Sequence, residues 1–412
     1  MKKVLITGAN GQLGTELKKA APVLSSFAFD FIDIDTLDLT KPDAVKRHFD
    51  QHRVDYLINC AAYTAVDKAE TEPEKAFLIN AEVPGMLQEI CTGNRCRMIH
   101  LSTDYVFDGQ AFLPYVETDI TAPQSVYAKS KLTGELEVLK HPDNIVIRTS
   151  WLYAAKGANF LNTMLRLGKE RESLNVVYDQ IGTPTSAADL ANAILSVCEQ
   201  IDTGKKEAGG IYHYSNEGVC SWYDFAVEIM ELAGLKCRIN PITSDQYPSP
   251  VKRPAYSVLN KAKIKAAFSL QIPYWKRSLE KVIESIKTDG EKTLRIITLI
   301  VILVLGVFIF WKYFYTYSEG YRAGLLQKFT RKGNIFKTYE GELILSSVTS
   351  TTNVALASEK FFFSVLDDSL ANVLDTLQGK FVTIHYKQKN GRVVWRGDTP
   401  YFVDQVKVEE NR

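Results

Sequence analysis

The chain has 412 residues, which is enough for two or three domains. Its 49 Lys and Arg residues nearly balance its 48 Asp and Glu residues, and no basic cluster with interleaved aromatic residues is present, so we expect no nucleic-acid partner. The six cysteines include no Cys-x-x-Cys pair, which indicates a reducing cytosol and excludes a disulfide framework or a cysteine zinc site.

The first residues predict a nucleotide-binding turn. Val4–Ile6 forms a short apolar strand, and Gly8, Gly11 and Gly14 follow it at the start of a helical pattern. Glycines in such a turn let the backbone approach a pyrophosphate, which then rests on the helix N-terminus. Asp33 ends a second apolar stretch, about where an acid that binds the ribose belongs. The alternative is an ordinary tight turn followed by a solvated acid.

Residues 1–150 alternate apolar strands with amphipathic helices, which predicts an α/β fold with a doubly wound, Rossmann-like parallel sheet that binds NAD(P). Ligands of such sheets bind beyond the carboxyl ends of the strands. Residues 151–286 have a mixed pattern and are predicted to form a small lobe that mainly binds the substrate. The predicted strands are Val4–Ile6, Phe29–Ile34, Tyr56–Ile58, Met98–Leu101 and Ile145–Ile147, and the predicted helices of the lobe are Phe160–Glu170, Ala187–Glu199 and Trp222–Ala233.

A hydroxyl and a Tyr-x-x-x-Lys motif form the most informative group in the chain. Thr103 follows an apolar run, and Tyr127 and Lys131 lie four positions apart on a predicted helix, where they share a face. A phenol with a pKa of about 10 needs a nearby cation to act as an acid–base group at neutral pH. Lys131 can supply that cation, and Thr103 can bond a substrate oxygen, so the group indicates carbonyl reduction. Alone the motif is weak, because solvated helix faces often carry the same spacing.

After a predicted linker at 287–294, residues 295–315 are predicted to form a transmembrane helix. Ile296–Trp311 is an unbroken apolar run between Arg295 and Lys312, long enough to cross a bilayer. The aromatic residues near its end resemble an interfacial belt. A buried core helix is the alternative, but the run is apolar all round and not along one stripe.

Charge does not set the orientation of this helix, because basic residues lie on both sides of it. The first strand begins at Val4, so we expect no signal peptide, a cytoplasmic N-terminal part and a single pass through the cell inner membrane. Residues 316–412 would then lie outside, as a small, mostly-β domain of unknown function that is a barrel or a sandwich. Its strand-like runs are Tyr339–Leu345, Phe361–Val365, Phe381–Tyr386, Val393–Trp395 and Phe402–Val408.

Residues 1–286 resemble the extended short-chain dehydrogenase/reductase superfamily, and within it the dTDP-4-dehydrorhamnose reductase family. The resemblance rests on several motifs that occur in the family's order. They are Gly8–Gly14, Ala61–Glu70, Ser102–Gly109, Tyr127 with Lys131, Arg148–Trp151, Asp179 with Gln180, Gly182, Pro184 with Thr185, and Arg253 with Pro254.

The resemblance implies NAD(P)H-dependent reduction of the C4 ketone of dTDP-4-dehydro-β-L-rhamnose, the last step of dTDP-rhamnose synthesis for cell-surface polysaccharide. It implies that Tyr127 donates the proton, that Lys131 holds the ribose and favours the phenolate, and that Thr103 stabilises charge on the reacting oxygen. It matches substrate contacts to Thr103, Asp104 and Trp151, although a core aromatic is the alternative for Trp151. The positions matched to cofactor contacts are Gly8, Gly11, Gln12, Leu13, Gly14, Asp33, Asp38, Leu39, Ala62, Tyr63, Thr64, Leu101, Tyr127 and Lys131.

The resemblance leaves the cofactor as NADPH or NADH. Asp33 would repel a 2′-phosphate, which favours NADH, although the family uses either. Tyr105 follows Asp104 where related sugar dehydratases have Glu, so the site should reduce and not dehydrate. Some family members dimerise through Mg²⁺ held by glutamates. Glu16 matches one such position, although a plain helix carboxylate is the alternative, and the resemblance does not place the others, so we predict no metal site and leave Mg²⁺ and a homodimer open.

Two other functions stay open. A non-catalytic, nucleotide-binding regulatory module would suit a membrane-anchored chain, but it would not need a proton donor such as Tyr127. Another nucleotide-sugar reductase or epimerase on the same fold would keep the same residues and differ in its substrate.

Overall fold

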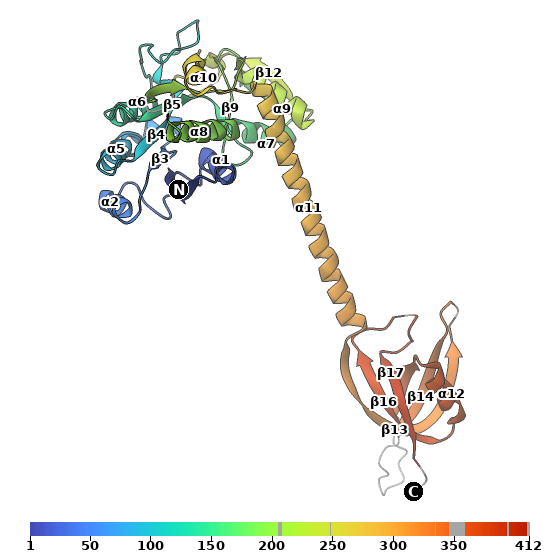
Figure 1. Cartoon of the computed structure of the whole chain (residues 1–412). Coiled ribbons are helices and arrows are strands. Elements are labelled where there is room, and N and C mark those ends of the chain that lie inside the picture. The colour runs from blue at the N-terminus through green and yellow to red at the C-terminus, as the bar shows by residue number, and fades with distance from the viewer. Residues whose placement is uncertain (205–207, 248, 334, 346–358, 394, 410–412) are drawn as a thin grey trace. The chain divides into compact units, whose positions relative to one another are not determined.

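The computed structural model describes residues 1–412 except 205–207, 248, 334, 346–358, 394 and 410–412, and of 289, 291, 293 and 294 it describes the backbone alone. The chain divides into two compact units, Met1–Asp289 and Gly290–Arg412. The first contains a parallel sheet and a smaller lobe, and the second contains the end of a long helix and a β-barrel (Figure 1).

A six-stranded parallel sheet forms the centre of the first unit. Its strands are β1 (Lys2–Thr7), β2 (Phe27–Ile32), β3 (Tyr56–Asn59), β4 (Arg97–Thr103), β5 (Ile145–Thr149) and β10 (Gly210–His213). Their order is β10-β5-β4-β3-β1-β2, and each neighbouring pair runs parallel. The order reverses direction between β1 and β3, so the crevice beyond these two strands is the ligand position of a doubly wound fold. The predicted fold class of this part is confirmed.

Helices cover both faces of the sheet, because successive side chains of a strand point to opposite sides. One face carries α1 (Gln12–Ala20) and α8 (Ala187–Asp202), and the other carries α2 (Pro42–Gln51), α5 (Val83–Gly93) and α6 (Val126–Val138). Val4 and Ile6 of β1 pack toward the first pair, and Leu5 packs toward the other set. The shorter helical segments are η1 (Ala21–Val23), α3 (Val66–Ala69), α4 (Pro73–Phe77), η2 (Leu78–Glu82) and η3 (Asp104–Val106).

The sheet extends beyond the boundary predicted at residue 150. β10 belongs to the segment predicted as the substrate lobe, yet it pairs with β5, Gly210 against Ile145. α8 of the same segment packs on α1. The chain therefore leaves the sheet after β5 and later returns to it, so residues 151–286 contribute to both the sheet and the lobe.

The lobe packs α7 (Phe160–Glu170) and α9 (Trp222–Ala233) against the parallel pair β7 (Ser173–Val177) and β12 (Arg238–Ile242). Both helices match the predicted ranges. α9 begins with a capping box of Ser221 and Asp224, and it ends at Gly234 with φ +71, which explains its sharp limits. The remaining elements are β6 (Leu152–Tyr153), β8 (Ile181–Gly182), β9 (Thr185–Ser186), β11 (Cys220–Ser221), η4 (Ser244–Gln246) and α10 (Ala262–Phe268).

The long helix α11 (Trp275–Tyr313) runs without interruption through the segment predicted as a linker, so residues 287–294 are helical. Its first turns place Trp275, Leu279 and Ile283 in the core of the lobe. By length and composition, its part Arg295–Tyr313 is long and apolar enough to cross a membrane, with 19 residues, a mean hydropathy of 2.5 and none of its apolar window buried.

The second unit contains a closed barrel of five strands, β13 (Thr316–Lys332), β14 (Thr338–Leu345), β15 (Glu359–Val365), β16 (Phe381–Lys389) and β17 (Tyr401–Val408). Their order is β13-β14-β15-β17-β16, with β13 paired to β16 and β15 parallel to β17. α12 (Asp368–Thr376) follows the third strand. This order and this helix position are those of an OB-fold barrel.

Four of the predicted runs in the tail coincide with β14, β15, β16 and β17. The run at Val393–Trp395 is wrong as a strand: Arg396 N donates to the Val393 carbonyl at 2.8 Å in a turn, and residue 394 lies outside the described part. The sequence pattern missed β13 and α12. The first half of β13 contributes few side chains to the core, so its apolar alternation is weak.

Candidate active site

Glycine shapes the turn after β1. Gly8 has φ +65, and a Cβ there would lie 2.7 Å from the backbone nitrogen of Ala61, which follows β3. A Cβ at Gly14 would collide with the Gly8 carbonyl oxygen. Only glycine therefore allows the ends of β1 and β3 to approach each other and lets α1 begin so close to the sheet.

α1 begins at Gln12, with Gly11 as its N-cap and no side chain capping it. The N–H groups of its first turn are therefore available to an anion. The Gln12 Oε1 atom accepts a hydrogen bond from Asn159 Nδ2 of the lobe at 2.8 Å. Leu13 lies in the core, at 6% exposure, so its backbone and not its side chain is what a ligand can contact.

A pocket of about 100 Å³ opens at the carboxyl ends of β1 and β2. Asp33, Asp38 and Leu39 line it, as the resemblance implies, and Ile79 and Val83 face them from the segment that precedes α5 and from its first residue. Apolar walls with acids at the rim suit a flat ring that carries a sugar, which is the adenosine half of a dinucleotide.

Backbone groups fix the two acids of this pocket. Asp33 accepts hydrogen bonds at 2.8 Å from the backbone nitrogens of Asn10 and Ile34. The side chain and the backbone nitrogen of Thr40 both donate to Asp38, and these bonds hold the pKa of Asp38 below its usual range. Both carboxylates are therefore held in place before any ligand binds.

The loop after β3 carries Ala62, Tyr63 and Thr64. Asn80 holds it from both sides, because its Oδ1 accepts from Tyr63 N at 2.8 Å and its Nδ2 donates to the Tyr63 carbonyl at 3.0 Å. Asn80 belongs to η2, a π-helical turn, a feature that often occurs at functional sites. The loop is thus fixed beside the glycine turn, where the resemblance expects it.

Thr103 is the last residue of β4, and its hydroxyl donates to Asp104 Oδ1 at 3.0 Å and accepts from Tyr105 N at 3.2 Å. Asp104 is 2% exposed, and burial raises its pKa to about 6 although hydrogen bonds from Ser257 and Thr103 oppose this. Its Oδ2 has no hydrogen-bond partner among the described residues. A polar substrate group can therefore bind at that oxygen.

Tyr127 is the second residue of α6, and its hydroxyl group meets the end of β4. Burial raises the pKa of Tyr127 to about 12, a side-chain hydrogen bond with Thr103 opposes the rise, and the Asp104 carboxylate adds to it. The Tyr105 ring meets the Tyr127 ring edge-on, with 5.8 Å between centroids. The phenol is therefore held in its protonated form at neutral pH, ready to donate.

Lys131 lies one turn further along α6, and it meets the same strand. Its Nζ donates to the Leu101 carbonyl at 2.6 Å and lies 3.3 Å from His100 Nε2. Lys131 is 2% exposed, and burial lowers its pKa to about 8 although the Glu135 carboxylate opposes this. Thr103, Tyr127 and Lys131 therefore meet at the carboxyl end of β4, as expected from the strand end at Thr103 and the helical spacing of the other two.

Sequence reasoning missed a buried hydrogen-bond chain behind Lys131. Asn59 Oδ1 accepts from Ala61 N at 3.2 Å and from the Thr7 hydroxyl at 2.7 Å, so its Nδ2 faces His100 Nδ1 at 3.0 Å. The ring nitrogen Nδ1 must accept, so a neutral His100 carries its proton on Nε2, toward Lys131. Burial and Lys131 hold the pKa of His100 well below its usual range. The position of Asn59 at a strand end was the available signal.

A buried ion pair fixes α6 against the sheet. Arg148 of β5 donates to Glu135 with its Nε at 3.0 Å and its Nη2 at 2.7 Å, and both side chains are at most 2% exposed. The guanidinium also lies 5.1 Å from the centre of the Phe107 ring. Glu135 is one turn beyond Lys131, so this pair positions the helix that carries Tyr127 and Lys131.

Trp151 has φ +46, a conformation that is strained for a non-glycine residue. Its indole stacks on Trp222, with 3.6 Å between ring centroids, and it covers Gly182. Trp222 lines a cleft of about 1010 Å³ in the lobe, which also includes Asp179 and Gln180. Sequence reasoning did not find Trp222, because a tryptophan at a helix start has no distinguishing pattern.

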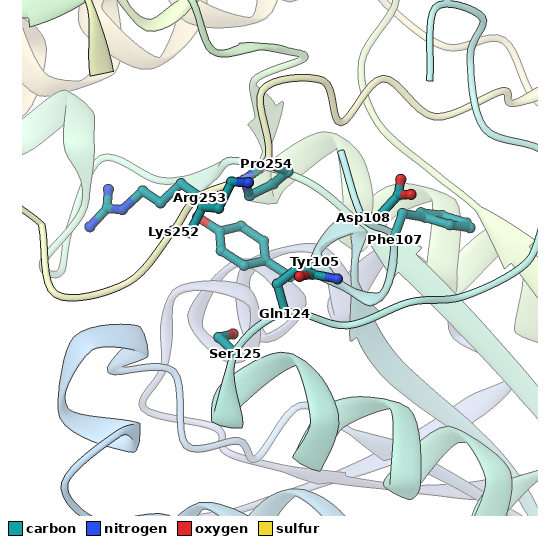
Figure 2. Close-up of a pocket in the computed structure, with 8 residues that line it drawn as sticks. All are labelled: Tyr105, Phe107, Asp108, Gln124, Ser125, Lys252, Arg253 and Pro254. Atoms are coloured by element: carbon teal, nitrogen blue, oxygen red, sulfur yellow. The ribbon is translucent and has the colours of Figure 1, made fainter. Parts of the chain in front are cut away.

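A narrow pocket lies beside Tyr105, close to the Tyr127 ring. Figure 2 shows Tyr105 and Ser125 on one side of it and the segment Lys252–Pro254 on the other. Arg253 Nη2 lies 3.4 Å from Asp67 Oδ2, so this segment also contacts α3. Arg253 therefore adds a positive charge to the lining of this pocket.

Glu16, which matches a metal-binding position of the family, pairs with a lysine of its own helix. Its Oε1 accepts from Lys19 Nζ at 2.6 Å, as a helix-surface pair. Within the described residues, no group of three or more His, Cys, Asp or Glu side chains is placed to hold an ion.

Two family models match the chain. The model of the RmlD substrate binding domain matches residues 1–288, and that of a domain of unknown function (DUF8785) matches residues 315–407. The first match covers more than half of the chain and includes every residue of the site described above.

Known proteins resemble the first of these regions. The dTDP-4-dehydrorhamnose reductase of Aggregatibacter actinomycetemcomitans is 41% identical over 289 residues, which are 68% of this chain and 98% of that protein. A dTDP-4-dehydrorhamnose reductase of Clostridium acetobutylicum has a TM-score of 0.66 at 41% identity and covers 69% of this chain and 99% of its own. The dTDP-4-dehydrorhamnose reductase of Bacillus anthracis, solved in complex with NADP, has a TM-score of 0.65 at 38% identity. The match covers 69% of this chain and 100% of that one.

Proposed function

The chain belongs over residues 1–288 to the family of dTDP-4-dehydrorhamnose reductases, and from this we propose that it reduces the C4 ketone of dTDP-4-dehydro-β-L-rhamnose to dTDP-L-rhamnose. The observation that carries the proposal is the meeting of Thr103, Tyr127 and Lys131 at the end of β4, next to the glycine turn. The product is an activated sugar for cell-surface polysaccharide.

Tyr127 donates the proton that the ketone oxygen takes up. Its pKa of about 12 keeps the phenol protonated. The hydroxyl of Thr103 turns its one proton from Asp104 to the ketone and donates to the same oxygen as negative charge develops on it. Lys131, held by the Leu101 carbonyl, stabilises the phenolate that remains. Asp104 bonds a hydroxyl of the sugar through its unpaired Oδ2, and the Trp151–Trp222 stack supports the sugar ring.

The residues of the first unit fit a nicotinamide dinucleotide, which supplies the hydride when bound. The Gly8–Gly14 turn and the start of α1 hold its pyrophosphate, and the pocket at Asp33 and Asp38 holds its adenosine. The relative from Bacillus anthracis binds NADP. In this chain backbone N–H groups hold the Asp33 carboxylate at the lining of this pocket, where its charge would repel a 2′-phosphate, so we expect NADH to be used with the lower KM.

The test is to incubate the purified chain with dTDP-4-dehydrorhamnose and either NADH or NADPH. Loss of reduced-nicotinamide absorbance together with dTDP-L-rhamnose as the product supports the proposal. Cofactor binding without turnover would instead indicate a regulatory module, and an epimer as the product would indicate another nucleotide-sugar enzyme.

We further propose that Arg295–Tyr313 crosses the cell inner membrane once, with the reductase unit in the cytoplasm and the barrel outside. The length and hydropathy of this helix, and the absence of buried residues from its apolar window, support a span. The need for a cytosolic cofactor supports the orientation.

Protease added to intact spheroplasts tests this arrangement. We expect it to remove the barrel after about residue 317 and to leave the reductase unit whole, with disrupted cells as the control in which both are accessible. Recovery of the full-length chain in the soluble fraction would contradict the span, and a protected barrel would contradict the orientation.

A further inference from the structure

The described part of the barrel exposes large apolar side chains on two neighbouring connections. Ile335 and Phe336 lie between β13 and β14, at 86% and 51% exposure, and Trp395 lies between β16 and β17, at 61%. The rings of Phe336 and Trp395 are 6.2 Å apart and meet edge-on. Ile335, Phe336 and Trp395 form one surface, here called the loop patch.

The connection that carries Trp395 contacts the chain just after α11 ends. Lys389 Nζ donates to the Phe314 carbonyl at 2.6 Å, and the Arg396 guanidinium lies 5.0 Å from the centre of the Phe314 ring. Thr316, the first residue of β13, pairs with Lys389, the last residue of β16. The connection that carries Trp395 therefore begins beside the end of the apolar helix.

Basic residues lie on the two connections that carry the loop patch, and Lys332, Lys337 and Arg392 are exposed there. Lys332, Lys337, Lys389, Arg392 and Arg396 lie on the same two connections or at their edges, and Asp398 pairs with Lys332 at 2.9 Å. Burial and the neighbouring Arg396 charge lower the pKa of Lys389. Aromatic and aliphatic tips surrounded by cations are typical of segments that lie at the boundary between lipid headgroups and acyl chains.

We propose that the loop patch inserts into the headgroup region of the bilayer and fixes the barrel against the outer face of the inner membrane. The proposal rests on the span proposed above. The bilayer is the occupant because the patch is continuous with the end of the apolar helix, where the last turn must leave the acyl chains. Ile335 and Phe336 enter the acyl boundary, and Trp395 lies at the carbonyl level. The exposed cations, Lys332, Lys337 and Arg392, bond phosphates. The barrel is then held at two points and not on a free tether.

Depth-dependent quenching tests the proposal. The full-length chain is reconstituted in phospholipid vesicles whose acyl chains carry bromine near the headgroup or near the bilayer centre. The other tryptophans are Trp151, Trp222, Trp275 and Trp311. The difference in emission between W311F and W311F/W395F isolates Trp395. We expect bromine near the headgroup to remove most of this emission and bromine at the centre to remove little of it.

A matched pair of variants gives the control. Phe336 on the patch and Phe362 in β15 are both 51% exposed, but Phe362 lies on the barrel wall. In a W311F/W395F background, the added emission of F336W should be quenched by the shallow bromine and that of F362W should not. Equal quenching of the two, or an unquenched Trp395, would overturn the proposal. Trp311 in the W395F variant reports the span separately: if it is quenched while Trp395 is not, the span stands and the loop patch fails.

Discussion

The two units of this chain place polar and apolar groups in opposite ways. The reductase unit buries ionisable side chains, and Lys131, Glu135 and Arg148 are each at most 2% exposed around α6. The barrel unit turns large aromatic residues outward, with Trp395 at 61% exposure. Burying a charge is costly unless it is paired, and exposing an aromatic ring is costly unless something covers it. The candidate site of the first unit is therefore found among its buried charges, and the surface proposed to contact a membrane in the second among its exposed rings.

The largest effect should come from the phenol at the centre of the reductase site. Tyr127→Phe removes the proton donor and leaves the ring in place, so we expect kcat to fall by roughly 10²- to 10⁴-fold. The free energy of unfolding should change little. Steady-state kinetics measure the first quantity, and the control is Tyr321→Phe on the barrel, whose ring is 66% exposed. If Tyr127→Phe turned over at the normal rate, Tyr127 would not be the proton donor.

The buried ion pair gives the next largest effect. Arg148→Met leaves the Glu135 carboxylate buried without its partner, so we expect the reductase unit to lose about 3–5 kcal/mol of unfolding free energy. Pulse proteolysis of the full chain in urea measures the loss. The double variant Arg148→Met, Glu135→Leu should recover most of it, because no unpaired charge remains. A double variant as unstable as the single one would mean that packing, and not charge, sets the cost.

The difference between the units also explains what the sequence could predict. The parallel sheet follows from continuous apolar runs such as Val4–Ile6, and the site follows from motifs at strand ends, because their spacing fixes which atoms meet. Thr103, Tyr127 and Lys131 lie within one stretch of 29 residues. Tyr127 and Lys131 share a helix face, and that face meets β4, which ends at Thr103. Short separations and regular elements make such a site predictable.

The missed features depend on long-range contacts. His100 and Trp222 have no distinguishing neighbours in sequence, and only the fold brings them next to Lys131 and Trp151. β10 joins the sheet from beyond residue 150, which no local pattern indicates. In the barrel, Trp395 looks like part of an apolar strand because Val393 precedes it, whereas the structure turns there. Exposed apolar residues resemble core residues until the fold is known.

A smaller effect should come from the hydrogen-bond chain behind Lys131. Burial lowers the pKa of this lysine to about 8, and the N–H of a neutral His100 faces its ammonium group. In Asn59→Asp, the carboxylate accepts from His100 Nδ1–H, and Nε2 then accepts from Lys131. We expect the pKa of Lys131 to rise by roughly 1 unit.

The sign of this change can be checked by the pH dependence of kcat. The pKa of Lys131 in the folded chain lies below its ordinary value, so the ammonium form is present below pH 8 and is lost as the pH rises through about 8. Activity that needs the ammonium should fall on the alkaline side, and Asn59→Asp should move that fall to higher pH. Burial makes the ammonium form of Lys131 less favourable in the folded chain than in the unfolded chain. This cost to the unfolding free energy is therefore fully present below the folded pKa of about 8, and it disappears as the pH rises toward the ordinary pKa of a lysine. Thr7→Val removes the neighbouring hydroxyl and leaves the histidine tautomer unchanged, so its profile should stay where it was.

The smallest effect should come from an ion pair on the surface of the barrel. Lys332 and Asp398 lie 2.9 Å apart and are 56% and 55% exposed, so water screens both charges. We expect Lys332→Met to change the unfolding free energy of the barrel by no more than about 1 kcal/mol, measured by pulse proteolysis as for Arg148→Met. Arg148→Met and Lys332→Met thus each remove the cation of one ion pair, the first buried in the reductase unit and the second exposed on the barrel. A loss as large as that of the Arg148 variant would mean that the barrel, too, depends on its charges, and the contrast between the two units would then fail.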